Sequence, residues 1–267
     1  MTPASFSFIA TDNIWREAAF LCFSIRQVSS QPIFCFCDLE TKTQLQKFDF
    51  GNIEFALNAT PADIARAEAE TESVQTQNGF HKKGAICLKM DALEWAVKEA
   101  GNTLFVDADI VFLKPPRIVD AEAMLSPHYH FDNVKQQNAK IGIFNAGYLW
   151  TNQASLGPEW KNIYLNYSSF YEQQGMWKLF ESFNCQLFDQ THNVGFWRFA
   201  RNWYKGNLES VRLHGLEIDE ITSGHFHIDA TAWRNADAGL AQGYAALKDW
   251  FFWKLPKAYK DFANALF

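Results

Sequence analysis

Two aspartates one residue apart, Asp107 and Asp109, lie directly after a hydrophobic segment near the middle of the chain. Leu104–Val106 before them and Ile110–Leu113 after them are apolar throughout. A buried carboxylate is costly unless a cation meets it, and two carboxylates at a strand end can each give an oxygen to a hard divalent ion. Such an ion can in turn hold a diphosphate. A polar turn that simply ends a strand is the alternative interpretation.

The composition limits the classes of function open to this chain. Its 267 residues suit one large domain, and 48% of them are hydrophobic. Aromatic residues make up 16%, including 25 Phe and 10 Trp, which exceeds what a core needs and indicates a surface for rings, sugars or lipid. The net charge of −6 and the lack of a basic stripe argue against nucleic-acid binding.

Cysteine usage and hydropathy favour a cytoplasmic protein. No two of the five cysteines have the two-residue spacing of a zinc knuckle, and their odd number favours reduced thiols. The N-terminus lacks the basic start and the long apolar run of a signal peptide. No segment approaches the roughly twenty apolar residues of a membrane-spanning helix. The cysteines are Cys22, Cys35, Cys37, Cys87 and Cys185.

The first half of the chain alternates predicted strands with predicted helices, which is typical of an α/β fold with a largely parallel sheet. Ligands of such sheets bind beyond the carboxyl ends of the strands, so we expect Asp12 and Asp107 in one crevice. Thr11, Asp12 and Asn13 also suit the N-cap of the following helix. The predicted strands are Ser5–Ala10, Pro32–Cys37, Ile53–Leu57 and Thr103–Val106, and the predicted helices are Ile14–Val28, Pro61–Ser73 and Ala85–Ala100.

The second half is less regular. The polar segment Pro127–Lys140 predicts a loop that could act as a lid or meet an acceptor. Because the chain has no repeats and no linker, we expect residues 1–267 to form a single domain, with parts at 1–115, 116–240 and 241–267. The other predicted elements are a strand at Ile141–Trp150 that Asn145–Gly147 interrupts, helices at Glu159–Gln173 and Gln190–Arg201, and short strands at Val211–Leu213 and Ile221–Ile228.

Four segments resemble, in the same order, motifs of the GT-A-fold glycosyltransferases. They are Phe8–Asn13, Leu104–Pro115, Phe144–Trp150, and the pair of Phe188–Gln190 with His225–Trp233. Within that fold the chain is most similar to the group of glycogenin and the bacterial lipooligosaccharide galactosyltransferases (glycosyltransferase family eight-like). The resemblance implies a Rossmann-like nucleotide-diphospho-sugar transferase with a mostly parallel central sheet, a nucleotide-sugar-binding half at 1–115 and an irregular acceptor half after it.

The resemblance also implies a metal site. In the family, the Asp-x-Asp acids and a later histidine hold Mn²⁺, and the metal neutralises charge on the leaving diphosphate. Carried over to this chain, Asp107, Asp109 and His225 would hold Mn²⁺ or Mg²⁺. Only one of His225 and His227 is expected to reach the metal. The position of Trp233 favours His225, and His227 is the alternate ligand. A hydrogen-bonded core histidine is the alternative for either ring.

The nucleotide side of the site follows from the same resemblance. The end of the first strand matches the place where base and ribose bind. Lys89 lies on a predicted helix one strand ahead of the two acids, where basic residues of related enzymes reach the donor phosphate. The residues expected to contact the nucleotide, besides Lys89, are Ala10, Thr11, Asp12, Asp107 and Ala108.

The third and fourth segments imply contacts with the transferred sugar. Asn145, Ala146 and Gly147 match a family segment beside the donor sugar, although such an interruption can also be only a β-bulge. Asp189 and Gln190 match an Asp-Gln pair that contacts the sugar, and with Asn145 they are the expected catalytic residues. The family retains the anomeric configuration; if this chain inverts it, Asp189 is the candidate base on the acceptor hydroxyl.

The chain departs from the family pattern after His225. Ile228 stands where the family has Gly, and Thr231 and Ala232 replace its Lys-Pro. The missing Lys normally binds the diphosphate, so this contact is in doubt, and Arg234 is a candidate substitute.

Two further features each allow two interpretations. Asp189 and His192, three apart on a predicted helix, could ligate a metal, but a coincidental pair is favoured. The C-terminal stretch Leu247–Phe267 mixes aromatic residues with lysines. We favour a helix whose aromatic face docks on the domain and is kinked by Pro256. Peripheral contact with the inner face of a membrane is the alternative.

Together these features predict a metal-dependent glycosyltransferase that moves a hexose from a nucleotide-diphosphate donor, with a UDP-sugar favoured, to a saccharide, glycolipid or glycoprotein acceptor. One alternative is a haloacid dehalogenase-like phosphatase, whose first motif Asp107–Val111 fits, with Asp219 and Glu220 as later acids; these two acids otherwise read as a solvated turn. The other is a sugar- or nucleotide-binding relic of the same fold. The sequence indicates no nucleic-acid partner and no particular oligomeric state.

Overall fold

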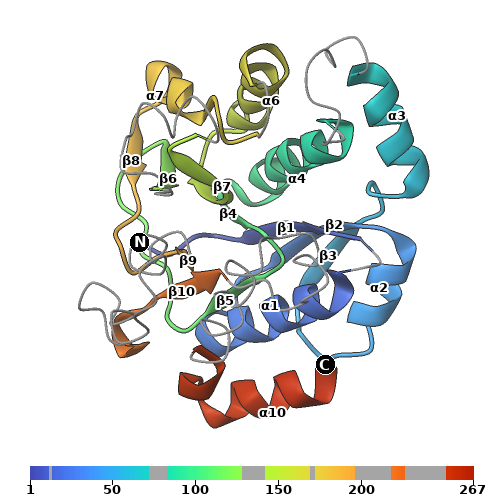
Figure 1. Ribbon diagram of the computed structural model, residues 1–267, viewed down its shortest axis with the longest axis vertical. Helices are drawn as coiled ribbons and strands as arrows, with labels where there is room; N and C mark the ends of the chain where they lie inside the picture. The colour runs from blue at the N-terminus through green and yellow to red at the C-terminus, as the bar shows by residue number, and fades with distance from the viewer. Residues whose placement is uncertain (12–13, 72–82, 128–141, 169–171, 196–217, 226–250) are drawn as a thin grey trace, which may run out of the picture.

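The computed structural model describes the chain except for residues 12–13, 72–82, 128–141, 169–171, 196–217 and 226–250. In the described residues the architecture is a central sheet with helices on both faces (Figure 1). Asp12, His227 and Arg234 lie outside the described residues, as do the predicted loop Pro127–Lys140 beyond its first residue and the predicted strand Val211–Leu213.

The central sheet has seven strands in the order β3-β2-β1-β4-β7-β6-β8. Strands β1 to β4 run parallel, whereas β7 is antiparallel to both of its neighbours and β8 runs parallel to β6. Most strand residues are buried, as expected for a sheet covered on both faces. The strands are β1 Phe6–Ala10, β2 Ile33–Cys37, β3 Ile53–Ala56, β4 Thr103–Val106, β6 Ala123–Pro127, β7 Phe144–Thr151 and β8 Cys185–Leu187.

Two hydrophobic clusters lie on opposite faces of the sheet (Figure 1). One packs α1 and α10 against it through residues such as Phe20 and Leu21, and the other packs α4 and α6 through residues such as Met90 and Trp160. The helices are α1 Trp15–Val28, α2 Leu39–Leu45, α3 Pro61–Thr71, α4 Lys83–Ala100, α6 Leu156–Tyr167, α7 Leu179–Ser182 and α10 Lys257–Leu266, with 3₁₀ turns η3 Met176–Lys178 and η7 Ile218–Glu220.

A second, three-stranded sheet brings distant parts of the chain together. Its order is β5-β10-β9, with β5 Ile110–Phe112, β10 Ser223–His225 and β9 Val194–Gly195. Strands β5 and β10 are antiparallel, and their register pairs His225 with Ile110. The residue after Asp109 is therefore directly opposite the predicted metal-binding histidine, which closes a sequence separation of more than a hundred residues.

The predicted α/β class and the mostly parallel sheet are confirmed, and the strand Thr103–Val106 has the predicted bounds. The predicted helix Gln190–Arg201 is wrong over its described part. Its first residues form a turn and Val194–Gly195 form β9. The side chains of His192 and Asn193 bond to other segments, and Asn193 has a φ of 51°, outside the helical range. The predicted helix Glu159–Gln173 instead spans Leu156–Tyr167.

Three smaller expectations also have outcomes. The N-cap of α1 is Ile14, which makes no side-chain capping bond, so Thr11 is not the N-cap residue. Thr11 contributes its backbone carbonyl instead, which accepts a hydrogen bond from the Ile14 amide at 2.9 Å. The five cysteines are all buried free thiols. Asp219 and Glu220 lie in the short turn η7 and are both exposed, as predicted for a solvated turn.

The C-terminal helix α10 docks on the domain by its aromatic face. Phe262 stacks on Phe23 with 4.3 Å between ring centroids, and the Tyr259 ring meets Phe20 edge-on. The buried Tyr259 hydroxyl donates to the Phe112 carbonyl of β5 at 2.8 Å, so α10 also braces the second sheet. No helix in the described part of the chain combines the length and the apolar character needed to cross a membrane.

Candidate metal centre

Asp107, Asp109 and His225 converge at the carboxyl end of β4. One ligand atom from each of the three lies within 4.8 Å of the others. The Asp109 Oδ1 and His225 Nε2 atoms are 3.1 Å apart, and both side chains are buried. Two carboxylates and an imidazole form a donor set that suits Mn²⁺ or Mg²⁺, so these residues fit the expected metal.

Backbone hydrogen bonds hold the two aspartates in a tight connection between β4 and β5. The amide of Ile110 donates to the Asp107 carbonyl at 3.2 Å, and the Asp107 amide donates to the Gly147 carbonyl of β7 at 3.0 Å. Ala108 between them is buried, with 5% of its surface exposed. The connection thus turns Asp109 toward β10 while Asp107 stays against β7.

Gly147 is needed because a carboxylate occupies the space where a side chain would begin. A Cβ atom built at Gly147 would meet Asp107 Oδ2 at 2.1 Å, far inside any real contact. The predicted interruption of this strand is a shift in pairing, since β7 itself continues through Phe144–Thr151 while its register with β6 shifts between Leu125 and Ser126. The Asn-Ala-Gly segment therefore lies against the candidate site and also belongs to the irregular, bulge-like pairing of β7 with β6.

Lys89 on α4 forms ion pairs with two acids of the site. Its Nζ lies 2.8 Å from Asp107 Oδ1 and 3.2 Å from Glu172 Oε1. Burial opposes the charge of the ammonium group, but the carboxylates of Asp107 and Glu172 outweigh it and hold the pKa of Lys89 above its ordinary value. The sequence prediction found Lys89 but missed Glu172, which lies in a segment with no recognisable motif.

Asn193 is a central residue that the sequence analysis did not select. It is fully buried, and its Oδ1 lies 3.0 Å from His225 Nδ1. Its Nδ2 donates to Asn145 Oδ1 at 3.1 Å and to Ser126 Oγ at 2.9 Å. Asn193 therefore joins the predicted metal ligand to the predicted sugar-contacting amide, although it lies in a turn that was predicted as helix.

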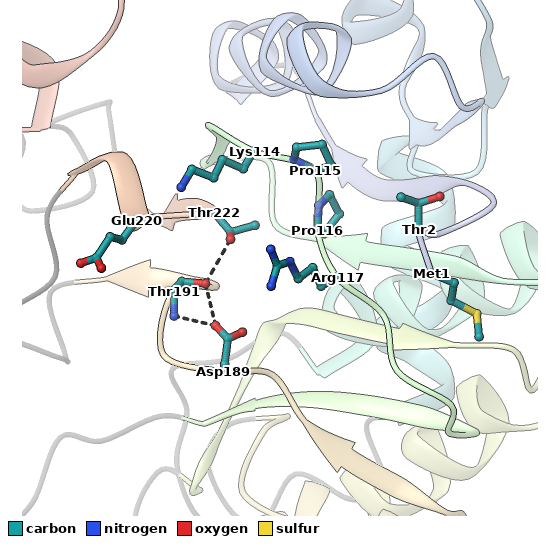
Figure 2. A pocket seen from close by; sticks show the side chains of 10 residues that line it. All are labelled: Met1, Thr2, Lys114, Pro115, Pro116, Arg117, Asp189, Thr191, Glu220 and Thr222. Carbon is teal, nitrogen blue, oxygen red and sulfur yellow. Dashed lines mark hydrogen bonds between the residues drawn. The ribbon is translucent and has the colours of Figure 1, made fainter.

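Asp189 faces a different hollow, which Figure 2 shows. Its Oδ1 accepts hydrogen bonds from the backbone amide and hydroxyl of Thr191 at 2.8 and 2.6 Å and lies 2.9 Å from His192 Nδ1. The hydrogen bond with His192 holds the pKa of Asp189 well below its ordinary value. The hollow has a volume of about 490 Å³ and is lined by Met1, Thr2, Lys114, Pro115, Pro116, Arg117, Asp189, Thr191, Glu220 and Thr222.

The structure places this hollow at the opposite end of β5 from the aspartate pair. Lys114 and Thr222 lie where β5 and β10 meet beyond Phe112, whereas Asp109 and His225 lie at the other end of the same two strands. Gln190 is exposed beside Asp189. The Asp189 carboxylate therefore bonds to Thr191 and His192 beside this hollow, and the sugar contacts expected from Asp189 and Gln190 stay predictions.

The other predicted residues lie close to the cluster in the fold. Ala10 ends β1 and is buried, Thr11 follows it, and Ala146 is buried in β7 between Asn145 and Gly147. The carboxyl end of β1 neighbours that of β4, since the two strands pair in parallel. The described part of the predicted nucleotide side is therefore at the same edge of the sheet as the aspartates.

Solved structures share this fold at low sequence identity. No protein-family model and no curated protein matches the chain. A crystal structure of the galactosyltransferase LgtC in complex with donor and acceptor sugar analogs matches with a TM-score of 0.59 and 14% identity, covering 97% of this chain and 99% of that one. Mouse xyloside xylosyltransferase 1 in its apo form matches with a TM-score of 0.53 and 12% identity, covering 84% and 98%.

A third match shows the same architecture in a longer protein. The glycosyltransferase GlyE of Streptococcus pneumoniae TIGR4 matches with a TM-score of 0.54 and 12% identity, covering 98% of this chain and 63% of that one. At such identities the likeness establishes the fold. The resemblance noted in the sequence is confirmed at this level: the chain has the GT-A fold of the glycosyltransferases.

Proposed function

We propose that this protein is a metal-dependent glycosyltransferase that moves a hexose from a nucleotide-diphosphate donor to a saccharide, glycolipid or glycoprotein acceptor. The observation that carries the proposal is the Asp107–Asp109–His225 cluster, placed at the carboxyl edge of a GT-A sheet. Ligands of open α/β sheets bind at this edge. The LgtC structure with donor and acceptor sugar analogs supports a nucleotide sugar and a saccharide as the two substrates.

Transfer requires the leaving nucleoside diphosphate to gain negative charge as the glycosidic bond breaks. A bound Mn²⁺ or Mg²⁺ would supply Lewis-acid stabilisation of that charge. Asp107, Asp109 and His225 would hold the ion; Asp109 and His225 are buried, and Asp107 is half-buried. Lys89 holds Asp107 in place from the side of α4 and adds positive charge within reach of the same carboxylate.

The sugar side of the proposal involves Asn145. Its Oδ1 already accepts hydrogen bonds from the Gly147 amide at 3.0 Å and from Asn193 Nδ2 at 3.1 Å. The contact expected with the donor sugar therefore falls to the Asn145 Nδ2 group. Catalytic roles for Asp189 and Gln190, a nucleotide contact of Asp12, retention of configuration and a UDP donor remain predictions from the resemblance. Arg234 as a substitute for the missing Lys, and a cytoplasmic location, remain predictions from the sequence.

Calorimetric titration of UDP, GDP, CMP and dTDP into the purified protein, with and without Mn²⁺, tests the proposal. We expect one nucleotide to bind only in the presence of the metal, and Asp109→Asn to abolish that binding. Asp261→Asn is the matched control, because it removes the same charge from an exposed ion pair with Lys257 on α10. Failure of every nucleotide to bind would overturn the proposal, and metal-independent binding that survives Asp109→Asn would indicate a binding relic.

A further inference from the structure

The orientation of His225 can be read from a chain of hydrogen bonds that starts at a backbone amide. The Gly147 N–H can only donate, and it lies 3.0 Å from a side-chain atom of Asn145. That atom is therefore the Asn145 carbonyl oxygen. The assignment matters because amide oxygen and nitrogen are otherwise assigned from their partners.

The position of the Asn145 oxygen in turn fixes the orientation of the Asn193 side-chain amide. Asn145 Oδ1 lies 3.1 Å from the amide group of Asn193, and two oxygens cannot form a hydrogen bond, so Asn193 presents its NH₂ group there. The opposite end of the Asn193 amide, its carbonyl oxygen, faces His225 Nδ1 at 3.0 Å. A carbonyl oxygen accepts, so Nδ1 carries the proton.

A proton on Nδ1 leaves a lone pair on Nε2 of the neutral ring. This lone pair points at Asp109 Oδ1, which lies 3.1 Å away and is also an acceptor. Two acceptors at this distance are stabilised when a cation lies between or beside them. Because 4% of the His225 surface and 6% of the Asp109 surface are exposed, water screens this pair poorly.

The backbone of Asn193 supports a fixed geometry. Its φ of 51° lies in the left-handed region, where Asn is enriched among non-glycine residues. The backbone N–H of Asn193 donates to Ser223 Oγ at 2.9 Å, and Ser223 lies on the same short strand as His225. Strand β9, which follows Asn193 directly, pairs with β10, so the two residues are locked together on both sides.

We propose that Asn193 is the positioning residue of the metal site. Oriented by Asn145 and the Gly147 amide, it fixes His225 in the tautomer with the proton on Nδ1 and presents Nε2 to the metal that Asp107 and Asp109 share. Partners of this kind orient metal-binding histidines and set their tautomer. The inference rests on the proposed metal-dependent function and adds a residue that none of the recognised motifs contains.

Asn193→Gly is the test variant, because glycine tolerates the positive φ and removes the amide without backbone strain. We expect Mn²⁺ affinity, measured by calorimetry, to fall about 10- to 100-fold. Ser126→Ala is the matched control: it removes another hydrogen bond of the Asn193 amide and leaves the path from Gly147 to His225 intact, so Mn²⁺ affinity should stay within about threefold of the parent.

A second measurement needs no variant of Asn193. In metal-free protein labelled with ¹⁵N-histidine, at a pH where the ring is neutral, the His225 signals should show a protonated Nδ1 and an unprotonated Nε2. His225→Gln assigns them by their loss. A proton on Nε2, or undiminished Mn²⁺ affinity of folded Asn193→Gly, would overturn the inference. If the parent protein binds no Mn²⁺, the proposed function itself fails, which is a separate result.

Discussion

The molecule contains two aspartate–histidine pairs of almost the same length with different surroundings. Asp109 and His225 are 3.1 Å apart at one end of β5 and β10, and Asp189 and His192 are 2.9 Å apart at the other end. Both histidines are buried. Distance and histidine burial therefore do not distinguish a metal site from a structural pair.

The partner of the second ring nitrogen makes the difference. His192 Nε2 accepts a hydrogen bond from the Arg117 backbone amide at 3.2 Å, so its Nδ1 carries the proton and donates it to Asp189. His225 Nδ1 instead donates to the Asn193 carbonyl oxygen, so in the neutral ring Nε2 is an acceptor that faces Asp109. In the Asp189–His192 pair the carboxylate accepts a hydrogen bond from the ring. In the Asp109–His225 pair two acceptor atoms face each other, and a cation would stabilise them.

The largest expected effect comes from removing the charge of Asp109 in the first pair. Asp109→Asn should lower kcat/KM on the order of 1,000-fold, because the metal contributes several kcal/mol and each 1.36 kcal/mol corresponds to about tenfold. Steady-state transfer assays with Mn²⁺ and calorimetric Mn²⁺ affinity measure this loss.

Asp189→Asn is the counterpart and should leave Mn²⁺ affinity within about threefold of the parent, because its pair lies at the far end of the strands. A loss of Mn²⁺ affinity comparable to that of Asp109→Asn would show that the two pairs do not differ as described. A loss of kcat with Mn²⁺ affinity intact would instead support the catalytic role predicted for Asp189 from the sequence.

Gly147→Ala should have the next largest effect, and it should act through Asp107 on the candidate metal cluster that contains the first pair. The added Cβ would need the space of Asp107 Oδ2, so the carboxylate must move away from the metal position. We expect Mn²⁺ affinity to fall about 10- to 100-fold. Gly101→Ala is a suitable comparison, since a Cβ there meets no atom within 4 Å. Because Gly101 has a positive φ, we expect this variant to be less stable than the parent while its Mn²⁺ affinity is unchanged.

Lys89→Met tests the charge balance at Asp107, the third member of the candidate metal cluster beside the first pair. Without the ammonium group, Asp107 and Glu172 face each other with uncompensated negative charge, and the metal-free protein should lose about 1–3 kcal/mol of unfolding free energy. Added Mn²⁺ should then raise the midpoint of thermal unfolding more than it does in the parent. An equal rise in both proteins would mean that Lys89 and the metal do not meet the same carboxylate.

The smallest effect concerns the pH dependence of the second pair. Because the hydrogen bond from His192 depresses the folded-state pKa of Asp189, its stabilisation is complete above the unfolded-state pKa of about 3.9 and is lost as the pH falls toward the folded-state pKa. The contribution stays below about 1 kcal/mol, since the Asp189 side chain is 57% exposed. Urea unfolding of the parent and Asp189→Asn should therefore differ near pH 6 and converge below pH 4; a difference that grows on acidification would contradict this.

The regular elements of the first half could be predicted from the sequence. Runs of apolar residues between turn residues gave β1, β2 and β4 almost to the residue, because strands buried on both faces leave continuous hydrophobic segments. Strands β6 and β8 were missed, since both are short and neither alternates clearly. The apolar spacing around Gln190–Arg201 suggested a helix where buried polar contacts impose a turn.

The sequence by itself determined the α/β class and the position of the aspartate pair after a buried strand, because these depend on residue types and local order. The histidine came from the resemblance to the GT-A glycosyltransferases. Only the tertiary structure decided that Asn193 orients His225, that Glu172 pairs with Lys89, and that Asp189 faces a separate hollow. The physical reason is that the polarity of a hydrogen bond depends on both partners. Those partners come from β7, from Asn193 directly before β9 and from β10, and only the folded sheets bring their polar atoms to 3.0 and 3.1 Å of one another.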